Sequence, residues 1–81
     1  MLHLTLYTRP GCHLCDTMKA VVATVAGATP IRLEEIDISN DAGLEREYGL
    51  QIPVLLVEGR RVAKYRVSVE ELRRIVQGRP T

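Results

Sequence analysis

The sequence lacks an excess of charge of either sign. Its 81 residues contain 11 Lys and Arg against 10 Asp and Glu, which leaves a formal net charge of +1. Proteins that bind nucleic acid or anionic membranes through bulk electrostatics carry a clear basic excess or a basic face. The composition therefore predicts neither a nucleic-acid partner nor a membrane partner.

Long hydrophobic runs are also missing. The N-terminal stretch MLHLTLYTRP has no basic leader, and its apolar residues alternate with polar ones. A signal peptide or a membrane span needs an unbroken apolar block. With 46% hydrophobic and 26% charged residues, the chain is expected to form one compact domain over 1–78 with a frayed tail at 79–81, and to be cytoplasmic.

Cysteine is scarce, since Cys12 and Cys15 are the only two in the sequence. Permanent structural disulfides are rare in a reducing cytoplasm. A lone Cys-x-x-Cys pair in such a chain is therefore expected to be redox-active or to bind a metal, rather than to hold the fold together.

Hydrophobic periodicity and turn residues predict seven elements. They are a strand at 2–7, a helix at 13–26 ended by Gly27, a strand at 30–39, a short helix within 40–50, two strands within 53–67 around a Glu58–Gly59 turn, and a helix from 68 to 78. The order β-α-β-α-β-β-α predicts an α/β fold with a four-stranded mixed sheet flanked by three helices. The strand–helix–strand start implies parallel pairing, and the hairpin adds an antiparallel edge.

Two local features are specific enough to test. The alternation in the second strand shifts by one residue around Glu34 and Glu35, which predicts a bulge or a change of the exposed face. Ser68 and Glu71 have the spacing of a capping box at the start of the last helix.

The cysteines stand at the N-terminus of the first predicted helix. Free backbone N–H groups and the helix dipole stabilise a thiolate there, which lowers the pKa of the Cys12 thiol, and Arg9 would act in the same direction if it folded back. Cys15, one helical turn later, is placed to attack a mixed disulfide on Cys12. We therefore predict that Cys12 is a nucleophile and Cys15 the resolving thiol.

For other polar and aromatic residues, the sequence gives weaker evidence of a functional role. A protonated His13 would favour the thiolate, whereas a solvated His13 would have little effect, and the sequence leaves both interpretations open. Asp16 is interpreted as an acidic residue that stabilises the helix N-terminus. Tyr48 and Tyr65 are expected to be packing residues with bonded hydroxyls rather than ligand-stacking residues.

The stretch LTLYTRPGCHLCDTMK, followed by YGLQIPVLLVEG, resembles the glutaredoxin-like branch of the thioredoxin superfamily over nearly the whole chain. The resemblance implies the minimal thioredoxin fold for this order of elements, and a thiol–disulfide oxidoreductase that transfers electrons to disulfides. It also implies a cis Ile52–Pro53 bond beside the cysteines, with the Ile52 backbone pairing with an extended substrate. The substrate-binding residues implied by the resemblance are Arg9, Gly11, His13, Leu14, Ile52 and Pro53.

The family's glutathione contacts match this chain in part. Arg9 stands where the family commonly has a lysine for a glutathione carboxylate, and Ile52 would pair with the backbone of the tripeptide. The usual Gly-Gly pair is replaced by AKYR at 63–66, and a loop without glycine forms an anion-binding nest less easily, although Lys64 or Arg66 could substitute by charge. The usual Cys-Pro-Tyr-Cys becomes Cys-His-Leu-Cys, which removes an aromatic residue beside the nucleophile.

These matches and mismatches set the expected partners. We expect a monomer that binds no cofactor permanently and acts on disulfide-containing proteins or small-molecule disulfides. The reductant is expected to be either glutathione or a thioredoxin-reductase-type protein.

Soft-metal binding is the main alternative, because the early Cys-x-x-Cys also resembles the heavy-metal-associated metallochaperones, which hold copper(I) through two thiolates. Their element order is β-α-β-β-α-β, whereas this chain is predicted to end on a helix. A tetrahedral zinc site from Cys12, Cys15, His13 and His3 is not plausible. Iron–sulfur bridging between two protomers, and a binding module that has lost turnover, stay open as further alternatives.

Overall fold

In the computed structural model, which describes residues 1–78, four strands form one mixed sheet in the order β2-β1-β3-β4. They are β1 (Leu2–Thr8), β2 (Ile31–Asp37), β3 (Val54–Val57) and β4 (Arg60–Lys64). β1 pairs in parallel with β2 and antiparallel with β3, and β3 pairs antiparallel with β4. This confirms the predicted α/β sheet. The predicted frayed tail at 79–81 lies outside the described residues.

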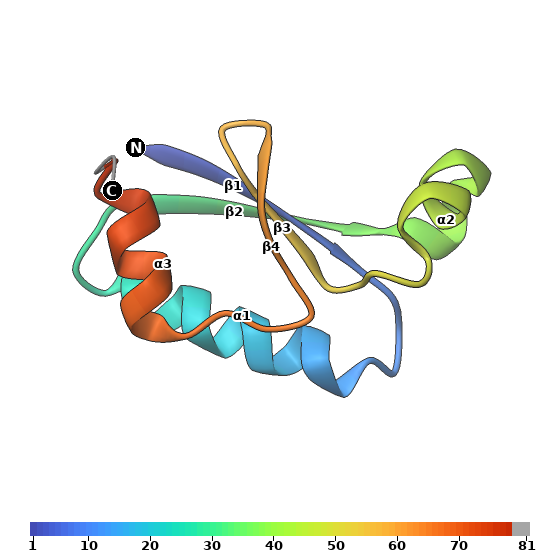
Figure 1. Ribbon diagram of the computed structural model, residues 1–81, viewed down its shortest axis with the longest axis horizontal. Helices are drawn as coiled ribbons and strands as arrows, with labels where there is room; N and C mark the ends of the chain where they lie inside the picture. The colour runs from blue at the N-terminus through green and yellow to red at the C-terminus, as the bar shows by residue number, and fades with distance from the viewer. Residues whose placement is uncertain (79–81) are drawn as a thin grey trace.

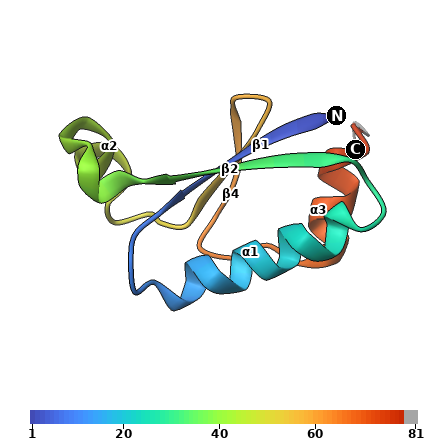
Figure 2. The same ribbon diagram turned by 180° about the vertical axis from the view of Figure 1, so that it is seen from behind.

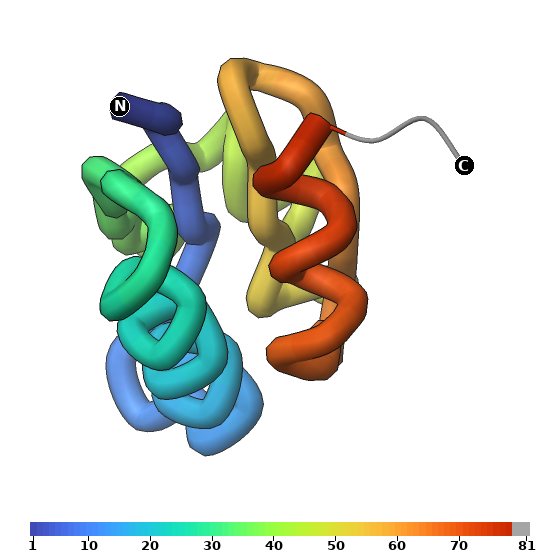
Figure 3. Tube along the Cα trace, turned by 90° about the vertical axis from the view of Figure 1, so that its left-hand side faces the viewer, coloured from blue at the N-terminus to red at the C-terminus, as the bar shows by residue number. Residues whose placement is uncertain are grey.

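Two helices, α1 (His13–Ala26) and α3 (Val69–Val76), cover one face of the sheet (Figures 1 and 3). Strands, α1 and α3 each contribute apolar side chains to a single cluster between the layers. Its buried members are Leu4, Leu6, Met18, Val22, Val25, Leu55, Leu72 and Val76. Burying a side chain of this kind contributes about 1.5–3 kcal/mol, so this layer is the main source of stability.

The third helix, α2 (Ala42–Tyr48), lies past the end of the strands, next to the 3₁₀ turn η1 (Ile38–Asn40) (Figures 1 and 2). Within residues 1–78, no helix lies over the sheet face opposite α1 and α3. His3 is on that face, 3.2 Å from the carboxylate of Glu34, and both side chains are about half exposed. The part of that face around His3 and Glu34 is therefore open to solvent. No helix in the described part of the chain is long and apolar enough to cross a membrane.

The shift in the apolar–polar alternation of the second strand reflects a change in which face of the strand carries the apolar residues. The register of β2 with β1 runs without interruption from the Leu2–Ile31 pair to the Thr8–Asp37 pair, so no bulge occurs in β2. Glu35 lies opposite the core residue Leu6, and its carboxylate is 3.3 Å from Lys19 of α1. Of the two predicted explanations, the bulge is thus wrong for β2. The irregularity of the sheet is instead between β3 and β4, at Leu55 and Leu56.

Element ends differ from the sequence predictions by a few residues. Ile38, predicted at the end of the second strand, belongs instead to η1 and is fully buried. The strand ends before it because Asp37 caps the 3₁₀ turn by accepting a bond from the Ser39 N–H at 2.9 Å. Hydrogen bonds from Ser39 hold the pKa of Asp37 below its usual value. Asp41 is the cap of α2.

The last strand and the last helix are both shorter than the sequence predicts. Residues 65–67, predicted to continue the last strand, leave the sheet after Lys64. α3 ends at Val76 rather than at Gly78, and its predicted capping box between Ser68 and Glu71 is confirmed.

Candidate active site

The loop between β1 and α1 places Cys12 at the helix N-terminus. Gly11 has a φ of +80°, a left-handed conformation that glycine adopts without the steric clash of a Cβ atom. Cys12 then follows in extended conformation and is the N-cap of α1. The predicted position of the Cys-x-x-Cys motif is therefore confirmed.

Cys12 and Cys15 are joined by a disulfide, with a Cα–Cα distance of 5.2 Å. The Cys15 backbone N–H points at the Cys12 sulfur, and the N···S distance is 3.1 Å. Cys12 is partly exposed, whereas Cys15 is only 1% exposed. Cys12 is thus the more exposed of the two, and its sulfur faces a helix N–H donor, while Cys15 is enclosed by the core.

The Ile52–Pro53 bond is cis, as the resemblance implied, and Pro53 is buried. Because Val54 pairs with Tyr7, this bond lies at the end of the sheet where β1 leads into the cysteine loop. Within residues 1–78, the backbone N–H and C=O of Ile52 form no hydrogen bond with another protein group. Ile52 therefore presents a free backbone donor and acceptor at this end of the sheet.

A cleft of about 440 Å³ lies between α1 and the segment that joins β4 to α3. Leu14 contributes to one side of it, and Tyr65, Arg66 and Val67 contribute to the other. His13, by contrast, is exposed at the start of α1. Leu14 is thus the member of the His-Leu pair that faces a concave surface.

The segment that replaces the glycine pair has few free amides. The N–H of Tyr65 donates to the Pro53 carbonyl at 2.8 Å and that of Arg66 to the Lys64 carbonyl at 2.7 Å. The Ser68 N–H donates to the Glu71 carboxylate at 3.0 Å, and these Ser68 bonds hold the pKa of Glu71 below its usual value. These amides are therefore committed to the fold, and a carboxylate lines the same cleft.

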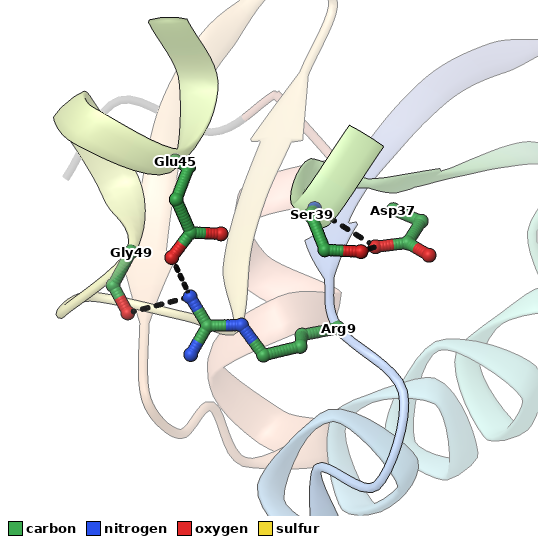
Figure 4. Close-up of polar contacts among 5 residues, drawn as sticks. All are labelled: Arg9, Asp37, Ser39, Glu45 and Gly49. Carbon is green, nitrogen blue, oxygen red and sulfur yellow. Dashed lines mark hydrogen bonds and ion pairs between the residues drawn. The ribbon is translucent and has the colours of Figure 1, made fainter. Parts of the chain in front are cut away.

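Arg9 does not fold back onto the helix N-terminus. Its guanidinium donates a hydrogen bond to the Glu45 carboxylate and contacts the Gly49 carbonyl at 3.4 Å (Figure 4). The side chains of Arg9 and Glu45 are 36% and 43% exposed. Arg9 thus links the cysteine loop to α2, an interaction that sequence reasoning missed.

The structure collects most of the predicted site residues at one end of the sheet. Gly11 to Cys15 form the helix start, and the Ile52–Pro53 bond stands at the same sheet end. Glu45 and Tyr65 were not predicted to take part, because their contacts join residues far apart in the chain. In residues 1–78, no three His, Cys, Asp or Glu side chains are grouped so as to hold a metal ion.

Comparisons with known proteins agree with this geometry. A profile described as "Glutaredoxin-like domain (DUF836)" matches residues 3–77. The X-ray structure of the structural genomics target XcR50 from X. campestris is 36% identical, with a TM-score of 0.77, over 95% of this chain and 99% of that one. Protein Ne2328 from Nitrosomonas europaea is 30% identical, with a TM-score of 0.78, over 88% and 86% of the two chains.

More distant structures share the fold. A mutant thioredoxin from Halobacterium salinarum NRC-1 is 23% identical and has a TM-score of 0.66, over 95% of this chain and 73% of that one. No curated protein matches the chain. The match over residues 3–77 and the thioredoxin-like topology show that the chain belongs to the glutaredoxin-like domain family (DUF836) of thioredoxin-fold proteins.

Proposed function

We propose that the protein is a dithiol–disulfide oxidoreductase that reduces disulfides of other proteins through Cys12 and Cys15. The observation that carries this proposal is the Cys15 N–H directed at the Cys12 sulfur at the N-terminus of α1, 3.1 Å away. An N–H donor and the positive end of a helix dipole both favour the thiolate over the thiol. The reduced Cys12 is then the nucleophile, because Cys12 is partly exposed whereas Cys15 is buried.

The reaction is two thiol–disulfide exchanges. The Cys12 thiolate attacks one sulfur of the substrate disulfide, the substrate S–S bond breaks, and one substrate sulfur leaves as a thiolate that takes up a proton. Cys15 then loses its proton and attacks the Cys12 sulfur. The Cys12–Cys15 disulfide forms and the second substrate thiol leaves, so that two electrons pass from the protein to the substrate.

The free backbone of Ile52 supports an extended polypeptide as the substrate. An extended segment adds to a sheet by pairing its main-chain N–H and C=O groups with an unpaired donor and acceptor. Ile52 offers one of each at the cysteine end of the sheet. A substrate cysteine held there would lie in a chain that is already oriented toward the nucleophile.

The contacts around the cleft favour a protein dithiol over glutathione as the reductant. Glutathione carries two carboxylates, and a site for it needs free amides or cations. Arg9 is engaged by Glu45, the Tyr65, Arg66 and Ser68 amides are engaged within the fold, and the Glu71 carboxylate offsets the charge of Arg66 in the same cleft. We propose a thioredoxin-reductase-type reductant in a cytoplasmic setting, with no permanently bound cofactor.

Two variants and a choice of reductant test the proposal. The oxidised protein is offered NADPH with thioredoxin reductase, or glutathione with glutathione reductase, and reduction of a disulfide peptide is followed. We expect turnover mainly with the first system, none for Cys12→Ser, and a peptide mixed disulfide trapped on Cys15→Ser that mass spectrometry identifies. In the reduced wild type, the ultraviolet absorbance of the Cys12 thiolate should appear at lower pH than in free cysteine. An unshifted titration together with no turnover would contradict the proposal.

A further inference from the structure

β4 and the residue after it hold the segment 50–53 on both sides of Ile52. The Tyr65 N–H donates to the Pro53 carbonyl at 2.8 Å, and the Tyr65 hydroxyl donates to the Leu50 carbonyl at 3.0 Å. Arg61 of β4 donates to the side-chain oxygen of Gln51 at 3.0 Å. The end of β4 and the start of β3 lie side by side in Figure 1, and the Val54–Lys64 pair confirms this.

Ile52 is the one residue of this segment that none of these bonds reaches. Leu50, Gln51 and Pro53 each accept a hydrogen bond from Tyr65 or Arg61. In the described part of the chain, the backbone of Ile52 has no protein partner. The bonds therefore hold the neighbours of Ile52 in place and leave its own N–H and C=O free.

Tyr65 is an unusual residue for this position in the backbone. Its φ is +67°, in the left-handed region that favours glycine, and the following amide closes a tight turn to Lys64. A glycine would adopt this conformation more easily, but it would have no hydroxyl to reach Leu50. The side chain is 42% exposed, so Tyr65 is not a core residue.

The bond from the Tyr65 hydroxyl to Leu50 fixes the main chain of Leu50, not its side chain. The Leu50 side chain is 93% exposed and contributes nothing to the core. What Tyr65 holds is thus the carbonyl of Leu50, and through it the course of the chain into Ile52. Its hydrogen bonds at Leu50 and Pro53 span the residue proposed to pair with the substrate.

We propose that Tyr65 is a positioning residue for the Ile52 backbone, and that it makes the protein prefer extended polypeptide disulfides over small disulfides. The inference rests on the proposed function, because it names how that site selects its substrate. Loss of the Tyr65 hydroxyl frees the Leu50 carbonyl and lets the segment before Ile52 move. A peptide that must pair with Ile52 is then bound less well, whereas a small disulfide needs no such pairing.

The test compares Tyr65→Phe with Tyr7→Phe. Within residues 1–78, the Tyr7 hydroxyl has no hydrogen bond. Tyr7→Phe therefore also removes a tyrosine hydroxyl but breaks no hydrogen bond, unlike Tyr65→Phe. Each protein is assayed with a disulfide peptide and with 2-hydroxyethyl disulfide. The readout is kcat/KM for the peptide divided by kcat/KM for the small disulfide. We expect the ratio to fall about threefold to tenfold in Tyr65→Phe, mainly through KM for the peptide, and to be unchanged in Tyr7→Phe. Arg61→Ala, on an exposed edge-strand residue, is expected to lower the ratio in the same direction.

A second substrate series separates positioning from a general loss of stability. The peptide is N-methylated one residue at a time around its cysteine, which removes one backbone donor in each member. The wild type should be sensitive to methylation at a particular position, and Tyr65→Phe should lose part of that sensitivity. An unchanged ratio and unchanged sensitivity overturn the inference alone, whereas a wild type that reduces no disulfide overturns the proposed function and the inference with it.

Discussion

The guanidinium of Arg9 is bonded to the carboxylate of Glu45, a residue 36 positions later in the chain. Figure 4 shows the Arg9 side chain extended from the cysteine loop to α2, where it also reaches the Gly49 carbonyl. An arginine three residues before the nucleophile is suited to bind a ligand carboxylate. Here an internal carboxylate already holds it.

Glu45→Gln is therefore expected to make the protein more reactive toward anionic disulfides. The substitution keeps the size of the side chain but removes the charge that Arg9 now neutralises. We expect the rate with glutathione disulfide, relative to that with the neutral 2-hydroxyethyl disulfide, to rise by up to about fivefold, the effect of one exposed ion pair.

The matched control for Glu45→Gln is Glu35→Gln. It removes the exposed Lys19–Glu35 pair, which has a nitrogen–oxygen distance of 3.3 Å and joins α1 to β2. This variant should leave the ratio of the two rates unchanged. Equal ratios in Glu45→Gln and Glu35→Gln would show that Arg9 has no part in discriminating charge.

Gly49→Ala is expected to destabilise the fold. A Cβ atom at position 49 would stand 2.8 Å from the Glu45 carboxylate and 3.3 Å from the Arg9 guanidinium, and it would also press on the Glu45 carbonyl. Overpacking of this kind costs about 1–3 kcal/mol. Urea unfolding measures the loss, with Gly27→Ala at the end of α1 as the control. There a Cβ atom meets only the Thr24 carbonyl at 3.3 Å, so an equal loss at both glycines would argue against close packing around Gly49.

Stability should fall at acidic pH in a way that depends on Glu71. Its bonds to Ser68 hold the pKa of Glu71 below the ordinary value of 4.5. The ionised form therefore stabilises the folded state above that ordinary pKa, and this contribution disappears as the pH falls through the lowered folded pKa. Glu71→Gln keeps a capping-box side chain without the charge.

Urea midpoints from neutral to acidic pH measure this contribution. We expect the wild type to lose stability more steeply below pH 4.5 than Glu71→Gln. Asp37, whose pKa is lowered by Ser39, contributes a similar slope to both proteins, so their difference reports Glu71 alone. Parallel curves for the two proteins would contradict the assignment.

Sequence reasoning located the elements that depend on near neighbours in the chain. The Ser68–Glu71 capping box joins residues three positions apart, and so does the contact between the Cys15 N–H and the Cys12 sulfur. Contacts over one helical turn are set by the helix itself once it forms. The strands could be predicted for the same reason, because apolar–polar alternation and turn residues are also local patterns. The shift of alternation at Glu34 and Glu35 nevertheless allowed two explanations until the register of β2 with β1 was known.

The amino-acid sequence by itself thus determined the order of elements and the Cys12–Cys15 pair at the start of α1. Only the tertiary structure decided what surrounds that pair, because the partners come from distant parts of the chain. It turned Arg9 toward Glu45, committed the amides of Tyr65, Arg66 and Ser68 to the fold, and brought Tyr65 to Leu50, 15 positions away. A hydrogen bond between distant residues depends on how the layers pack, and no local pattern of residues records that packing.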